Sequence, residues 1–133
     1  MLKVHSSEFN YQYGDQIHFP YRISSLVAYI RSKEILNKNF DFQKAFVLRE
    51  HVDEHIQKCK DADILLCSCY VWNWEITNFL ASEVHKINPN CTIVFGGAHV
   101  PDFSEDFFEE HPYVDFIVHG EGEIVLEEFL TAY

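Results

Sequence analysis

Apolar positions along the chain fall into two alternating kinds of segment. The first kind is short and rich in Val, Ile, Leu and Phe, and it predicts β-strands at residues 2–6, 44–48, 63–69, 92–96 and 115–120. The third and fourth of these runs are apolar at nearly every position. That pattern is typical of strands covered on both faces in a parallel sheet.

The second kind of segment is longer and has an apolar stripe with a period near 3.6 residues. It predicts helices at 22–36, 50–59, 74–87 and 103–110, and a last helix from Glu121 onward. Proline cannot continue a helix, so the "NPN" that follows residue 87 marks the end of the third of these helices.

Strand and helix alternate five times, which predicts an α/β fold. Right-handed crossovers of this kind build a three-layer, doubly wound, five-stranded parallel sheet, and the simplest strand order is the flavodoxin-like (Rossmann-like) 2-1-3-4-5. Such sheets bind ligands at the carboxyl ends of their strands. We therefore expect the site in the loops 7–21, 70–74, 97–102 and 120–123.

Length and charge narrow the class of protein. A chain of 133 residues without repeats or linkers is expected to form one domain, residues 1–133. The net charge of −11 argues against nucleic acid or an anionic membrane as the main partner, because both need clustered Lys and Arg. No apolar run approaches a spanning helix and the start has no signal-peptide core, so we expect a cytoplasmic location.

Glycines end two successive predicted strands. Gly96 and Gly97 follow the fourth strand, and Gly120-Glu121-Gly122 follow the fifth. Glycine permits a positive φ and lets a ligand lie directly against the main chain. A tight turn between strand and helix would explain either glycine pair by itself. Two neighbouring strands that both end in glycine instead favour a site for a flat or extended ligand that lies against the main chain.

Aromatic residues gather after the third predicted strand, in "CYVWNWE". Core packing is expected for one of Trp72 and Trp74, but together they fit the wall of an apolar pocket. The sequence leaves open which of the two faces the site. His99 follows the Gly-Gly turn, where a histidine more often makes hydrogen bonds than binds a metal.

Other catalytic patterns are weak. Cys67 and Cys69 share one face of a strand, but without C-x-x-C spacing they are more typical of small buried side chains than of a metal site. The run from His51 to His55 spells H-x-x-E-H, a short pattern that recurs by chance in chains unlike the large zinc peptidases. Phosphate-loop, dinucleotide and serine-hydrolase motifs are missing, and the strand ends lack the Asp and Lys of phosphoacceptor receiver domains.

Three segments, "DILLCSCYVWNWE", "NPNCTIVFGGAHVPD" and "EEHPYVDFIVHGEGE", occur in the order and spacing of a known family. The chain resembles the cobalamin-binding domain that precedes the radical S-adenosylmethionine barrel in cobalamin-dependent radical enzymes. "FPYRISSLVAYIRS" is similar to that domain's first helix. The resemblance covers nearly the whole chain and implies cobalamin as cofactor and a radical S-adenosylmethionine barrel, in cis or in trans, as partner.

In that family the corrin lies over the carboxyl edge of the sheet and its nucleotide tail reaches down among the strands. The implied cofactor-binding residues are Ser68, Tyr70, Val71, Trp72, Gly96, Gly97, His99, Gly120, Glu121 and Gly122. Ser68, Tyr70, Val71 and Trp72 would meet the lower corrin face or the tail. Gly96 and Gly97 would let the tail pass. Gly120, Glu121 and Gly122 would border the amide groups of the ring.

Two motifs are missing. The D-x-H-x-x-G that places a histidine beneath cobalt in other cobalamin proteins is not found, since Asp15 and His18 have a different spacing. The C-x-x-x-C-x-x-C that holds a 4Fe-4S cluster is also missing. The resemblance therefore implies S-adenosylmethionine and the cluster only in a longer parent, with the barrel beginning where this domain ends.

Because the motif for the 4Fe-4S cluster is missing, we do not expect the isolated domain to be an enzyme. A complete parent is expected to be a methyltransferase or an oxidoreductase. The alternative is a cobalamin-free interaction or substrate-docking domain of the same fold, and a flavin-binding protein is a third, weaker candidate.

Overall fold

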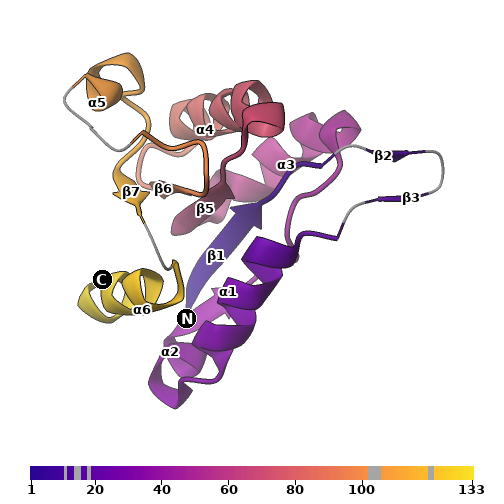
Figure 1. Cartoon of the computed structure of the whole chain (residues 1–133). Helices are drawn as coiled ribbons and strands as arrows, with labels where there is room; N and C mark the ends of the chain where they lie inside the picture. The colour runs from indigo at the N-terminus through magenta and orange to yellow at the C-terminus, as the bar shows by residue number, and fades with distance from the viewer. Residues whose placement is uncertain (11, 14–15, 18, 102–105, 120–121) are drawn as a thin grey trace.

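A computed structural model describes residues 1–10, 12–13, 16–17, 19–101, 106–119 and 122–133 (Figure 1). Its main sheet has five parallel strands in the spatial order β4-β1-β5-β6-β7. Their bounds are β1 (Leu2–Ser7), β4 (Phe40–Phe42), β5 (Ile64–Ser68), β6 (Thr92–Gly96) and β7 (Phe116–Val118). Counted along the chain, this is the order 2-1-3-4-5, and the predicted topology is confirmed.

Helices cover both faces of the sheet and make the three predicted layers (Figure 1). One face carries α1 (Tyr21–Arg31), α2 (Glu34–Asn39) and α6 (Gly122–Ala132). The other carries α3 (Val52–Lys58), α4 (Trp74–Ile87) and α5 (Phe107–Glu110). Short 3-10 turns lie at η1 (Arg49–His51), η2 (Cys59–Asp61) and η3 (Val71–Asn73), and β2 (Gln12–Tyr13) and β3 (Gln16–Ile17) form an antiparallel pair.

Alternate residues of the central strand β5 belong to opposite cores, because successive strand side chains point to opposite faces. Ile64 and Leu66 pack with α1, α2 and α6, whereas Leu65 and Cys67 pack with α3 and α4. All five residues of the strand are buried. The nearly continuous apolar run that predicted this strand therefore reflects coverage on both sides.

The second strand was predicted in the wrong place. The prediction put it at 44–48, but the paired segment is Phe40–Phe42, in which both phenylalanines are buried and Asp41 between them is exposed. This period of two is typical of a strand, whereas the later run pairs with β1 through an isolated bridge between Ser7 and Phe46.

One helix prediction also needs correction. The predicted helix 22–36 is two helices, because Lys33 adopts an extended backbone between α1 and α2. The predicted helix 103–110 is described only as α5, since residues 102–105 lie outside the described part.

Within the described ranges, no helix has both the length and the apolar character needed to cross a bilayer.

A stack of three rings fixes the segment after β4 to the sheet. The Phe46 ring lies between two imidazoles, with ring centroids 5.2 Å from His5 and 4.3 Å from His55. His55 Nε2 also donates to the Leu48 carbonyl at 3.1 Å. Both histidines are buried, and burial lowers the pKa of each below its usual value.

Protonation of His55 is therefore expected to destabilise the fold. The unfolded chain takes up a proton as the pH falls through about 6.5, before the buried imidazole does, so the free energy of unfolding falls below that pH. Between about pH 7.5 and about pH 5.5 the wild type should lose about 1 kcal/mol more than His55→Gln, which keeps a donor for Leu48. Urea unfolding measures this, and His85→Gln on the exposed face of α4 is the control. An equal loss of unfolding free energy in the wild type and in His55→Gln would contradict the assignment of this pH dependence to His55.

Candidate functional site

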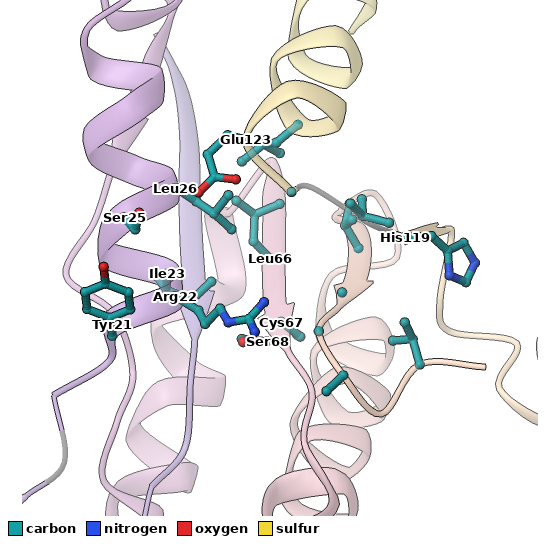
Figure 2. A pocket seen from close by; sticks show the side chains of 18 residues that line it. Tyr21, Arg22, Ile23, Ser25, Leu26, Leu66, Cys67, Ser68, His119 and Glu123 are labelled. Carbon is teal, nitrogen blue, oxygen red and sulfur yellow. The ribbon is translucent and has the colours of Figure 1, made fainter. Parts of the chain in front are cut away.

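A cavity of about 650 Å³ lies between α1 and α6, over the carboxyl ends of β5, β6 and β7 (Figure 2). Its apolar wall consists of side chains from both helices and the sheet, namely Ile23, Leu26, Leu66, Val94, Val118 and Leu126. Polar side chains from α1, the strand ends and α6 also line it, namely Arg22, Ser25, Ser68, His119 and Glu123. The cavity therefore occupies the edge where a doubly wound sheet is expected to bind its ligand.

Gly96 ends β6 and lines this cavity. A Cβ built on it would meet Val118 Cβ at 3.6 Å and the Val118 carbonyl oxygen at 3.7 Å, which are ordinary van der Waals contacts. The fold therefore does not require glycine at this position. A side chain here would instead take up space in the cavity.

Gly97 has a different reason to be glycine. Its φ is 106°, and a Cβ would lie 2.6 Å from the carbonyl oxygen and 2.8 Å from the nitrogen of Cys69. The Cys69 backbone is held in place on both sides, since its N–H donates to the Gly96 carbonyl at 2.7 Å and its carbonyl accepts from His99 N–H at 3.1 Å. The turn after β6 thus packs against the end of β5 so closely that only glycine fits.

The last glycine turn closes the other side of the cavity. Gly122 begins α6, and a Cβ there would lie 3.1 Å from Leu26 Cδ2 of α1. The first turn of α6 therefore approaches α1 closely, and both contribute to the cavity. Gly120 and Glu121, also predicted as site residues, lie outside the described residues.

Asn73 organises the turn that follows β5. Its buried amide donates to the Ser68 carbonyl at 3.0 Å and to the Phe9 carbonyl at 3.2 Å, and its Oδ1 accepts from Tyr70 N–H at 2.8 Å. The side chain thus joins the carboxyl ends of β1 and β5 and fixes the 3-10 turn Val71–Asn73.

The two tryptophans have separate places. Trp72 stacks on Tyr70, with centroids 4.5 Å apart and an interplanar angle of 5°, and remains 44 % exposed. Trp74 packs edge-on against Phe95 in the core on the α4 side of the sheet. Of the two tryptophans, Trp72 is therefore the one at the exposed carboxyl edge.

Contacts fix the exposed turn between Tyr70 and Asn73. Trp72 Nε1 donates to Asn10 Oδ1 at 3.4 Å, and the Arg49 guanidinium donates to the Trp72 carbonyl. Val71, in the middle of this turn, is 72 % exposed. The turn thus presents apolar surface to solvent, while hydrogen bonds with Asn10, Arg49 and the Asn73 side chain hold it in place.

The structure groups the predicted site residues in three places. Ser68, Gly96, Gly97 and Gly122 line the cavity. The predicted residues from Tyr70 to Trp72 form the exposed turn that follows Ser68. His99 lies elsewhere, because its ring packs against Trp74 at 5.0 Å, and Trp74 belongs to the core on the α4 side.

Sequence reasoning missed several residues of the cavity. It interpreted α1 and α6 as core helices, so their contribution to a cavity was not foreseen. It also missed Glu8, which does not line the cavity but whose buried carboxylate accepts from Ile23 N–H at 3.0 Å in the first turn of α1. Burial raises the pKa of Glu8, although hydrogen bonds from the helix backbone oppose the shift. No local signal marks a capping residue fifteen positions away.

The cysteines and histidines do not assemble a metal centre within the described ranges, where no group of three candidate ligands comes together. Cys67 and Cys69 are buried free thiols. Burial raises the pKa of Cys67 to about 12. Both side chains pack among apolar residues on the α4 side, so they act as small core side chains.

Comparison with known proteins agrees with this geometry. The profile of the B12 binding domain family matches residues 15–130. The chain therefore belongs to the B12-binding domain family.

Its relatives include much longer enzymes. It is 41 % identical over 106 residues to the cobalamin-dependent radical SAM methyltransferase TokK of Streptomyces tokunonensis, covering 80 % of this chain and 16 % of that protein. It is 45 % identical over 91 residues to the 2-(S-pantetheinyl)-carbapenam-3-carboxylate methyltransferase of Streptantibioticus cattleyicolor, covering 68 % and 13 %. An anaerobic magnesium-protoporphyrin IX monomethyl ester cyclase of Cereibacter sphaeroides is 39 % identical over 59 residues, covering 41 % and 10 %. The chain thus spans about a sixth or less of each relative.

The two adjacent glycines should respond differently to the same small change. Gly97→Ala should lower the free energy of unfolding by at least about 2 kcal/mol, because the new methyl group meets the Cys69 backbone at a positive φ. Gly96→Ala should change it by less than about 1 kcal/mol. Urea unfolding of both variants checks this. Equal losses of unfolding free energy would contradict the conclusion that the fold requires glycine at position 97 but not at position 96.

Proposed function

We propose that this domain binds cobalamin with the nucleotide tail in the cavity between α1 and α6 and the corrin over the carboxyl edge of the sheet. The observation that carries the proposal is the cavity itself, which opens at that edge and is kept clear by Gly96, a position where the fold does not need glycine. Membership of the B12-binding domain family supports the same assignment.

The size and lining of the cavity fit the tail. About 650 Å³ lies within the range of roughly 300–1,000 Å³ that buries most of a small ligand. The apolar side chains of Leu66, Val94 and Leu126 suit an aromatic base that has left cobalt. Ser68, at the end of β5, supplies a hydroxyl at the same wall.

The exposed turn after β5 supports the position of the corrin. Val71 and Trp72 present apolar surface beside the strand end that lines the cavity, and a broad flat ligand would remove that surface from water. The sequence has no D-x-H-x-x-G, so we assign no protein histidine beneath cobalt. Asp15 and His18 lie outside the described residues.

We further propose that the domain serves a radical S-adenosylmethionine enzyme, with the barrel in cis or in trans. Two relatives carry methyltransferase names, which favours methyl transfer over the oxidoreductase alternative. Bound cobalamin would supply a cobalt centre able to carry a methyl group, while the protein holds and orients it. S-adenosylmethionine and the 4Fe-4S cluster would belong to the barrel, and the cytoplasmic location stays a prediction.

Titration with hydroxocobalamin tests cobalamin binding. The purified domain should change the visible spectrum to that of the base-off form, and Trp72 fluorescence should be quenched. Gly96→Leu should weaken binding at least about tenfold, because its side chain enters the cavity, while far-UV circular dichroism stays unchanged. Ala28→Leu, on the exposed side of α1, is the control for added bulk.

No spectral change in the wild type up to roughly 100 μM would contradict cobalamin binding and favour the docking-domain alternative. If Gly96→Leu binds as tightly as the wild type, cobalamin binds without using this cavity.

A further inference from the structure

One cationic side chain borders the cavity of an otherwise strongly acidic protein. The net charge is −11, yet Arg22, in the first turn of α1, lines the cavity and is its one Lys or Arg among the described residues. Figure 2 shows its side chain extending from α1 toward Ser68 at the end of β5. The guanidinium therefore lies across the cavity and not along the surface of its own helix.

The backbone at the start of α1 does not provide the same positive charge. The Glu8 carboxylate, 4 % exposed, already accepts the Ile23 N–H at 3.0 Å and so occupies this helix end. Within the described part of the chain, no carboxylate lies within ion-pair distance of Arg22, although its charge interacts at longer range with the Glu8 carboxylate. The Arg22 side chain is thus the group on the α1 side of the cavity that can neutralise an anion.

The proposed ligand carries one such anion. The nucleotide tail of cobalamin contains a single phosphodiester, placed between the aromatic base with its ribose and the linker to the corrin. The apolar wall around Leu66 and Leu126 can take the base, but an unpaired phosphate there would lose its hydration without compensation. A cationic donor beside this apolar wall would compensate for that loss.

From this arrangement we propose that Arg22 binds the phosphate of the cobalamin nucleotide tail, an inference that rests on the proposed function. A guanidinium can donate two parallel hydrogen bonds to a phosphate, which a lysine cannot match. Glu123, which lines the cavity from α6, repels an anion and so favours the α1 side. Arg22 would thereby let the domain distinguish complete cobalamin from corrinoids that lack the tail.

Cobinamide provides the test, because it keeps the corrin but lacks the phosphate, the ribose and the base. Dissociation constants of hydroxocobalamin and diaquacobinamide are measured for the wild type, Arg22→Met and Arg22→Lys. We expect Arg22→Met to weaken cobalamin binding about tenfold or more and to leave cobinamide binding within about twofold. Arg22→Lys should lose less, because it keeps the charge but not the paired donors.

Lys38→Met is the control, since it removes one positive charge from the exposed end of α2, away from the cavity. An equal loss of both corrinoids in Arg22→Met, or no loss of either, overturns the role of Arg22 while leaving cobalamin binding intact. Failure of the wild type to bind either corrinoid overturns the proposed function and this inference with it.

Discussion

The turn after β6 can lie where it does only because residue 97 has no side chain. At a φ of 106° its Cα faces the Cys69 backbone, and a methyl group would come within 2.6 Å of the Cys69 carbonyl oxygen. This contact fixes the end of β5 against the end of β6. From that fixed point Ser68 lines the cavity, and Asn73 connects the same strand end to Phe9 after β1.

The adjacent Gly96 shows how a structural glycine differs from one that makes room for a ligand. Gly96 is the last residue of β6 and Gly97 follows it directly, and the sequence offers no way to separate their roles. Only the surroundings do, because Gly97 faces backbone whereas Gly96 faces open volume bounded by Val118. Because the fold would tolerate a side chain at position 96, the open volume beside Gly96 is a physical reason to infer that a ligand occupies it.

Much of the architecture followed from the sequence because it depends on hydrophobic periodicity. The bounds 74–87 and 92–96 match α4 and β6, since both are long or deeply buried segments with an unambiguous period. The edge strand Phe40–Phe42 was missed because three residues carry too little pattern to compete with the longer apolar run after it. That run owes its apolar character to a different contact, the packing of Phe46 between two histidines.

The candidate site was predictable only in part. The ends of the predicted strands indicated the glycine turns, because parallel strands bring their carboxyl ends to one edge of the sheet, whereas Ser68 was implied only by the family resemblance. The walls from α1 and α6 could not be foreseen, since a helix stripe looks the same whether it meets a sheet or leaves a gap over one. Arg22 and Glu8 depend on how α1 is placed over the sheet, which no local sequence pattern encodes.

The most direct measurement is a crystal structure of this domain grown with hydroxocobalamin. We expect the base to have left cobalt and to lie between α1 and α6, with the tail passing over Gly96. A corrinoid whose base remains on cobalt, with the cavity free of ligand, would contradict the proposed binding mode.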